Sequence, residues 1–325
     1  MLMVTVMLIY GGRGLEREVS ILGAQHLLPR IRGDFRPLPV LIDKDGRWLN
    51  EGKELLLCRG GVLKDGEFIK TDCAIPLLHG DYGEDGRVQG ALDCASIPYV
   101  GCDGVVGAIC RNKYIVKAVA DRLSVPTLPC LLAVRGEDTD GIANECERKI
   151  GYPLFLKPTS LGSSVGASQV RSREELKEAL SLAFTLTDRV IVEPLLADKR
   201  ELECGYLRIK GKDLFTKCGE ILCKGFYDYQ KKYAADGADT SVVAKLTRAA
   251  QDKIRDYSAA LVRGLGVRDI ARIDYFLSGD KIYFNEINTM PGMTESSLYP
   301  KMIEASGVSL DQMTEGLIRG ALYGR

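Results

Sequence analysis

Two segments far apart in the chain carry residues suited to phosphate and metal chemistry. Residues 157–166 read KPTSLGSSVG, so a lysine leaves an apolar run and enters a turn of small residues whose backbone N–H groups can bind a phosphate chain. The second segment contains Arg272 and Asp274, followed by NEINTMPGM at 285–293. Its two carboxylates, amide and guanidinium suit Mg²⁺ that carries phosphate. Together the two segments predict an enzyme that consumes ATP.

The polar residues of the second segment alternate along two predicted strands that flank SGD at 278–280. The first strand carries Arg272, Asp274 and Phe276, and the second carries Phe284, Glu286 and Asn288. If the connecting loop has an odd number of residues, Arg272 lies opposite Glu286 and the four polar side chains share one face. A change of one residue in the loop would place them on opposite faces.

A solvated face of an ordinary sheet is the alternative for this hairpin. The positions between the polar residues are apolar, namely Ile273, Tyr275 and Ile287. A merely solvated face explains poorly why two acids, an amide and a guanidinium gather on the other side. The pattern therefore favours a binding site.

The glycine-rich turn at 157–166 is weak evidence by itself, because loops use glycine for its backbone freedom. It matches neither a P-loop nor a dinucleotide-binding turn. Residues 193–196, EPLL, end another apolar run. The carbonyl of Pro194 and the N–H of Leu196 could serve an adenine ring; the alternative is the plain edge of a core strand.

Two further polar residues follow apolar runs. His79 begins a glycine-rich loop at 79–86, and such loops lie at strand ends where open α/β sheets bind ligands. A structural histidine is the alternative. Glu16 follows the turn GGRG at 11–14 and could be a first-turn acid that interacts with a helix dipole.

The opening of the chain predicts a doubly wound α/β domain, with a strand at 4–10, a turn and a helix at 18–31. Further helices are expected at 112–123, 174–184 and 247–263, the second behind a capping box at 172–175. Further strands are expected at 152–157, 189–193 and 201–209. Residues 225–240 show no periodicity, so they are expected to form a long loop of the kind that often serves as a lid.

The bulk composition narrows the class of protein. With 325 residues the chain is expected to form two or three domains, and 44 basic residues against 44 acidic ones give no reason to expect a nucleic acid or membrane partner. Ten cysteines form no Cys-x-x-Cys pair and there are two histidines, so a structural zinc site is not expected. No export signal or membrane-length apolar run is evident, which predicts a cytoplasmic protein.

In this order, the segments resemble the D-alanine–D-alanine ligases of the ATP-grasp superfamily. The strongest stretches lie at 11–20, 78–90, 157–166, 226–233 and 285–293. The resemblance implies a three-domain α/β ATP-grasp architecture: a Rossmann-like substrate domain at 1–112, a central subdomain at 113–196, and a C-terminal subdomain at 197–325 with the metal site and a lid at 225–240. It also implies synthesis of D-Ala-D-Ala for peptidoglycan.

The resemblance also implies roles for individual residues. Those expected to bind ATP are Lys113, Lys157, Ser163, Glu193, Pro194, Leu195, Leu196, Glu201 and Lys232, with Glu203 competing with Glu201 for the ribose. The metal ligands are Asp274, Glu286 and Asn288. The first D-alanine would meet Glu16 and His79, and the second Ser297 and Leu298. Catalysis would involve Glu16, Ser163 and Tyr233 as a hydrogen-bonded group, and Arg272 and the Gly292 N–H at the oxyanion.

The implied cofactors and partners are small. ATP is a substrate, Mg²⁺ is expected at two sites with Mn²⁺ able to substitute, and D-alanine is the amino acid; a homodimer is expected. A D-Ala-D-Ser or D-Ala-D-lactate ligase is the alternative, although Tyr233 favours an amine acceptor over D-lactate. A sensor of ATP or amino acid without catalysis is a further alternative, against which the retained Arg272, metal ligands and lid residues argue.

Overall fold

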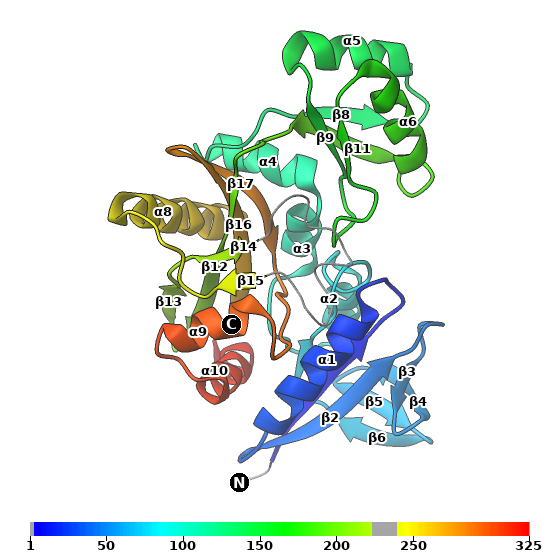
Figure 1. Ribbon diagram of the computed structural model, residues 1–325. Coiled ribbons are helices and arrows are strands. Elements are labelled where there is room, and N and C mark those ends of the chain that lie inside the picture. Colours follow the sequence, from blue (N-terminus) through cyan, green and yellow to red (C-terminus); the bar gives the residue numbers. More distant parts are fainter. Residues whose placement is uncertain (1–2, 223–238, 325) are drawn as a thin grey trace.

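The computed structural model describes residues 3–222 and 239–324, which form three β-sheets with helices packed on them (Figure 1). The sheets have seven, four and six strands and follow one another along the chain. In Figure 1 the four-stranded sheet lies at the top, the six-stranded sheet in the middle and the seven-stranded sheet below. The predicted mixed α/β architecture is confirmed. Across the described residues, no helix combines the length and apolar character needed to span a membrane.

The first sheet has the order β6-β5-β4-β3-β2-β1-β7. Its strands are β1 (Val4–Gly11), β2 (Phe35–Ile42), β3 (Trp48–Asn50), β4 (Lys53–Cys58), β5 (Gly61–Lys64), β6 (Glu67–Lys70) and β7 (Cys73–Pro76). β1 runs parallel to β2 and β7, while β2 to β6 pair antiparallel. Side chains 6–9 of β1 are fully buried, as expected of a parallel strand covered on both faces.

The predicted strand–turn–helix opening is present, but its helix is shorter than expected. α1 (Arg17–Leu27) is followed by a 3₁₀ turn at Leu28–Arg30 rather than continuing to residue 31. Pro29 explains the break, because it has no N–H to continue the α-helical hydrogen bonds. α2 (Arg87–Cys94) and α3 (Gly104–Arg111) follow the sheet.

The second sheet has the order β10-β9-β11-β8 and is antiparallel. Its strands are β8 (Leu131–Val134), β9 (Leu154–Pro158), β10 (Ser168–Val170) and β11 (Arg189–Pro194), with helices α5 (Thr139–Lys149) and α6 (Arg173–Ala183). The Ser172 hydroxyl accepts from the Glu175 N–H, as the capping box predicts. The Glu175 carboxylate, however, accepts from the Arg171 N–H and not from Ser172, so the box closes one residue earlier.

The third sheet has the order β15-β14-β12-β16-β17, with β13 paired to β12. Its elements are β12 (Arg200–Ile209), β13 (Lys212–Phe215), β14 (Gly219–Leu222), β15 (Asp239–Ser241), α8 (Arg248–Leu265), β16 (Ile270–Ser278), β17 (Lys281–Asn288), α9 (Leu298–Ala305) and α10 (Leu310–Tyr323). Most of the predicted loop at 225–240 lies outside the described residues. Its last two residues, Asp239 and Thr240, belong to β15, because they pair with β14.

The β16–β17 hairpin reaches the predicted arrangement by a different route. Ser278 pairs with Lys281, so the loop has two residues and not an odd number. The register then shifts at Asn285, an extra residue that forms a β-bulge, and Asp274 pairs with Glu286. Asn285 makes the number of residues between the paired positions Asp274 and Glu286 odd, as a loop with an odd number of residues would have done.

The bulge also corrects two details of the predicted hairpin. Arg272 lies opposite Asn288 and not opposite Glu286. Phe284 pairs with Tyr275 and packs edge-on against it in the core, with ring centroids 6.2 Å apart, so it leaves the face that carries Glu286. The four polar side chains still share one face, as predicted.

Helix α4 (Lys113–Arg122) connects the sheets. It begins behind the Asn112 side chain, which accepts from two N–H groups of the first turn, and the Lys113 N–H donates to the Thr159 carbonyl at 2.8 Å. α4 also packs against β17 and α8 of the third sheet. Each sheet lies within one of the predicted domains. The boundaries 1–112, 113–196 and 197–325 stay a prediction, because α4 contacts elements of both the second and the third of these domains.

Gly86 and Gly90 provide a matched test of the contact between α2 and α3. Gly86 has φ of +91°, and a Cβ there would lie 2.4 Å from the Gly104 carbonyl oxygen, whereas a Cβ at Gly90 meets nothing within 4 Å. The backbone conformation alone costs an L-residue about 1 kcal/mol. Gly86→Ala should therefore lower the thermal midpoint by about 3 °C or more, while Gly90→Ala, within the helix, should keep or slightly raise it. Equal midpoints in calorimetry would contradict this account.

Candidate functional site

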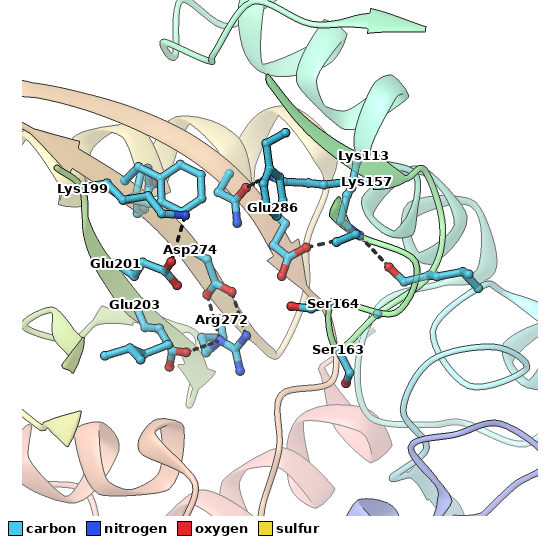
Figure 2. A pocket seen from close by; sticks show the side chains of 18 of the residues that line it. Lys113, Lys157, Ser163, Ser164, Lys199, Glu201, Glu203, Arg272, Asp274 and Glu286 are labelled. Atoms are coloured by element: carbon cyan, nitrogen blue, oxygen red, sulfur yellow. Dashed lines mark hydrogen bonds and ion pairs between the residues drawn. The ribbon is translucent and has the colours of Figure 1, made fainter. Parts of the chain in front are cut away.

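A cleft with about 850 Å³ of empty volume lies between the second and third sheets (Figure 2). Figure 2 shows lysines from α4 and β9 on one side and the acidic side chains of β12, β16 and β17 on the other. The sequence-predicted residues that line it are Lys113, Lys157, Ser163, Glu201, Arg272, Asp274 and Glu286, together with the competing Glu203. Residues from distant parts of the chain thus meet in one cleft.

Behind the cleft, Glu193 forms a buried ion cluster with two lysines. Its carboxylate oxygens lie 2.6 Å from the Lys117 ammonium and 2.7 Å from that of Lys157, and its side chain is 1% exposed. Burial alone would raise the pKa of Glu193, but the two lysines lower it from 4.5 to about 2. Glu193 is therefore an anion that positions Lys157, and it does not itself line the cleft.

Lys157 reaches from this cluster toward β17. Its ammonium donates to the Asn285 side-chain carbonyl at 2.9 Å and lies 5.2 Å from the centre of the Phe276 ring. Asn285 is the bulge residue, so the irregularity that aligns the acidic side chains also contacts the lysine. The bulge therefore couples the two predicted functional segments.

Lys113 contacts both halves of the predicted site. Its ammonium donates to the Leu161 carbonyl at 2.8 Å and lies 3.4 Å from the Glu286 carboxylate. Burial lowers the pKa of Lys113, while Glu286 acts in the opposite direction. The lysine thus links the loop at 157–166 to the acidic face of the hairpin.

The predicted metal ligands are held by cations and an amide. Arg272 donates two hydrogen bonds to Asp274, at 2.8 and 2.7 Å, and the Asn288 amide donates to the same carboxylate at 3.2 Å. Burial would lower the pKa of Arg272, but Asp274 and Glu203 raise it well above its ordinary range. Arg272 therefore remains charged and orients Asp274 toward the cleft.

The donor set fits a hard divalent cation that shares its coordination with phosphate. Asp274 and Glu286 are cross-strand partners on the cleft face, and carboxylate oxygens are the ligands that Mg²⁺ prefers. Among residues 3–222 and 239–324, no three His, Cys, Asp or Glu side chains group as a complete metal cage. Mg²⁺ is commonly bound by one or two protein carboxylates and completes its shell with substrate phosphates and water.

Glu201 and Glu203 differ in their surroundings, although both come from β12. Glu203 is 5% exposed and lies 3.3 Å from the Arg272 guanidinium. The Glu201 side chain is 28% exposed and pairs with Lys199 at 2.9 Å, and Lys199 in turn lies 4.0 Å from the centre of the Phe276 ring. Glu201 is thus the more accessible acid, beside an aromatic wall.

Glu16, in the loop between β1 and α1, contacts the loop at 157–166. The Ser163 hydroxyl donates to its carboxylate at 2.6 Å, and the Arg111 guanidinium lies 4.0 Å from it. A Cβ on Gly80 would lie 2.3 Å from the Glu16 carboxylate, and one on Gly162 would lie 2.9 Å from it. A side chain at either position would displace the Glu16 carboxylate from its present place, so the backbone of two loops lies directly against this carboxylate.

The other residues predicted to bind the two amino acids lie in or beside the segment that follows β17. His79 is buried, and its Nδ1 lies 3.0 Å from the Met290 carbonyl oxygen. The Ser297 hydroxyl accepts from the Thr294 N–H at 3.1 Å and would lie 3.0 Å from a Cβ on Gly292. The Leu298 side chain is buried in the core, so only its backbone can face a ligand.

Other predicted residues are placed less directly. Pro194, Leu195 and Leu196 do not line the cleft, and the Leu195 N–H donates to the Pro153 carbonyl at 2.9 Å. Lys232 and Tyr233 lie outside the described residues, and their roles stay predictions.

The residue-by-residue prediction of the site missed Lys117, Arg111, Lys199 and Asn285. Lys117 could have been found, since it lies four residues after Lys113 on the same helical face. Arg111 joins Glu16, Asp81 and Glu84, at N···O distances of 4.0, 3.6 and 3.7 Å. These contacts connect the end of α3 with the loop before α1 and the loop before α2, and no spacing in the sequence predicts them.

Comparison with known proteins adds independent findings. The chain matches the family models described as D-ala D-ala ligase C-terminus, over residues 121–319, and D-ala D-ala ligase N-terminus, over residues 59–102. It is 38% identical to a D-alanine–D-alanine ligase of Deinococcus radiodurans, covering 98% of this chain and 99% of the relative. A D-alanine–D-alanine ligase of Chlorobium phaeovibrioides is 34% identical, with 98% and 97% covered.

Two solved structures are closely similar. D-alanyl-alanine synthetase A from Vibrio cholerae has a TM-score of 0.92 at 31% identity, with 99% of each chain covered. The VanG D-Ala:D-Ser ligase from Enterococcus faecalis has a TM-score of 0.89, also at 31% identity and 99% coverage of both chains. The fold and length of this chain therefore agree with both structures from end to end.

The ion cluster around Glu193 generates a stability prediction. Glu193→Gln leaves two buried lysines without their carboxylate, and breaking a buried ion pair in this way costs roughly 3–5 kcal/mol. Because the pKa of Glu193 is lowered from 4.5 to about 2 on folding, its contribution is complete above pH 4.5 and is lost as the pH falls toward 2. Denaturation of wild type and variant should therefore differ most at neutral pH and converge in acid.

Glu145, whose side chain is 46% exposed and pairs with Lys149 on α5, offers a control for this measurement. Glu145→Gln should leave the denaturation midpoint nearly unchanged at every pH. A Glu193→Gln variant as stable as wild type at pH 7 would show that the cluster does not stabilise the fold.

Proposed function

The chain belongs to the D-alanine–D-alanine ligase family, and on this basis we propose that it joins two D-alanines into D-Ala-D-Ala at the expense of ATP, for peptidoglycan synthesis. The observation that carries the proposal is the cleft in which Lys113, Lys157, Asp274 and Glu286 converge. Cations suited to phosphate face acids suited to a metal there, and the Glu16–Ser163 bond ties this cleft to the first sheet.

The reaction proceeds in two steps. The carboxylate of the first D-alanine attacks the γ-phosphorus of ATP, ADP leaves, and an acyl phosphate forms. The amine of the second D-alanine then attacks the acyl carbon, phosphate leaves with the electron pair of the broken C–O bond, and the amine loses a proton. Because the first step brings two anions together, it needs positive charge around the phosphates.

The residues of the cleft provide this charge. We assign the phosphates to Lys113, Lys157, Lys232 and the loop at 157–166. In the structure, Lys113 contacts the Glu286 carboxylate and a peptide oxygen, and Lys157 contacts the Glu193 carboxylate and an amide oxygen. The ribose is assigned to Glu201, because it is the more exposed of the two candidate acids, and the adenine to residues 193–196. Asp274, Glu286 and Asn288 would hold Mg²⁺ at two sites, with Mn²⁺ able to substitute, and the metal would neutralise phosphate charge.

The amino-acid subsites lie toward the first sheet. Glu16 is assigned to the ammonium of the first D-alanine and His79 to its carboxylate. Ser297 and the Leu298 N–H are assigned to the carboxylate of the second. Arg272 and the Gly292 N–H would stabilise the oxyanion that develops on the acyl carbon. Tyr233 completes the proposed hydrogen-bonded group with Ser163 and Glu16.

Several parts of the proposal come from the sequence and the family. The segment 225–240 would close over the acyl phosphate and exclude water that would hydrolyse it. The three domains would be 1–112, 113–196 and 197–325. A homodimer in the cytoplasm is the expected state.

A D-serine acceptor is the second candidate, because the VanG D-Ala:D-Ser ligase shares 31% identity with this chain over 99% of its length. D-Serine differs from D-alanine by one hydroxyl, which a pocket without a dedicated partner rejects weakly. The decisive experiment offers D-alanine, D-serine and D-lactate together with ATP and Mg²⁺ and identifies products by mass spectrometry. D-Ala-D-Ala should dominate. A dominant mixed product would replace the acceptor assignment, and bound ATP without any product would favour a sensor.

The proposed metal site depends on Glu286. Glu286→Gln keeps the shape of the side chain but removes one negative charge beside the phosphates. Phosphate release with ATP, Mg²⁺ and D-alanine should fall by about 10²-fold or more, given what electrostatic groups contribute to phosphoryl transfer.

Asp280→Asn is the matched control for that variant, since Asp280 is exposed in the turn of the same hairpin. It should keep near wild-type turnover. A Glu286→Gln enzyme that also turns over normally at ordinary Mg²⁺ would refute the assignment.

A further inference from the structure

Helix α1 contacts the segment after β17 through a histidine that the proposed reaction does not use. His26 lies in the last turn of α1, and its Nδ1 lies 2.8 Å from the Met293 carbonyl oxygen. The segment at 289–297 carries Gly292 and Ser297, which are assigned above to the oxyanion and the second amino acid. Figure 1 shows this orange segment passing beside α1 on its way to α9.

The neighbours of His26 define its tautomer. A carbonyl oxygen can only accept, so Nδ1 carries the proton and donates to Met293. The Arg30 guanidinium can only donate, and it lies 3.2 Å from Nε2, which therefore presents its lone pair. Arg30 also donates to the His26 carbonyl and lies 3.9 Å from Asp311 of α10. The Nδ1–H donor of the ring is thus directed at the segment.

Apolar packing alone does not define the position of this segment. Met290 and Met293 are buried among apolar side chains of α1, β7 and α10. Methionine fills irregular space with a flexible side chain, so it constrains the backbone weakly. Directional hydrogen bonds constrain it more strongly, and the chain's two histidines, His26 and His79, contact the carbonyls of Met293 and Met290.

We propose that His26 is a positioning residue for the second amino acid. The hydrogen bond from its Nδ1–H to the Met293 carbonyl fixes the position of the backbone that presents the Gly292 N–H and the Ser297 hydroxyl. α1 begins directly after Glu16 and has His26 in its last turn, so one helix connects the proposed subsite of the first amino acid with that of the second. The inference rests on the proposed function for the identity of the substrates, but the contact itself does not.

Three variants separate the hydrogen bond from the shape of the side chain. His26→Asn keeps an N–H donor near the position of Nδ1, His26→Gln places its amide near Nε2 instead, and His26→Ala removes both. Gln25→Ala, at an exposed neighbouring position of α1, is the control. The measurement is phosphate release against D-alanine concentration, fitted with separate KM values for the first and second D-alanine, and against ATP.

We expect His26→Ala and His26→Gln to raise the KM for the second D-alanine by about tenfold, the effect of one lost hydrogen bond. The KM for ATP and for the first D-alanine should stay within about twofold. His26→Asn and Gln25→Ala should resemble wild type. An unchanged KM in His26→Ala, equal behaviour of the Asn and Gln variants, or a parallel rise of all three KM values would each overturn the proposal.

Hydrogen exchange of the ligand-free protein tests the contact without any activity. Amides of 289–297 should exchange faster in His26→Ala and His26→Gln than in wild type and His26→Asn, because the segment loses an anchor. Equal exchange in all four proteins would overturn the positioning role. Failure of the wild type to form any dipeptide would instead reject the proposed function, while the exchange result would still decide whether His26 fixes the segment.

Discussion

The buried carboxylate of Glu193 is the interaction on which the cleft depends. It pairs with Lys117 of α4 through one oxygen and with Lys157 of β9 through the other, and these lysines belong to elements that approach each other only in the folded chain. Two buried ammonium groups without a counter-ion would each carry a large desolvation cost. Glu193 offsets that cost, and so lets Lys157 extend toward β17, where it meets Asn285.

Electrostatic balance continues across the cleft. Lys113 lies beside Glu286, Arg272 holds Asp274 and contacts Glu203, and Lys199 pairs with Glu201. Each of these charged side chains therefore has a partner within the protein. A ligand that brings phosphates and a divalent cation can replace these contacts with equivalent ones, so the same side chains serve the stable fold and the proposed ATP complex.

The first sheet contributes to the cleft through close contacts and not through charge alone. Gly80 and Gly162 allow two loops to approach the Glu16 carboxylate, which also accepts from Ser163. At the other end of α1, His26 holds the segment that follows β17. The helix thus touches the surroundings of both proposed amino-acid subsites.

The sequence by itself determined the chemistry and most of the elements. The alternation around Asp274 and Glu286 and the lysine before the small-residue turn at 157–166 were enough to predict an enzyme that consumes ATP. The ligase activity was predicted from the resemblance of the ordered motifs to a known family. Local patterns carry this information because strand periodicity and turn composition depend on neighbouring residues. The family resemblance then supplied the roles of residues such as Glu16 and Ser297.

Tertiary structure decided the features that depend on contacts between distant segments. The hairpin loop has two residues, so the shared polar face depends on the bulge at Asn285, which no local pattern specifies. Glu193, predicted beside adenine, has two lysines as partners, and Glu203 is engaged by Arg272 while Glu201 stays more exposed. Arg111 and His26 have partners far away in sequence or on other loops. Such pairings follow from how the sheets and helices pack, because only packing brings these side chains within hydrogen-bonding or ion-pairing distance.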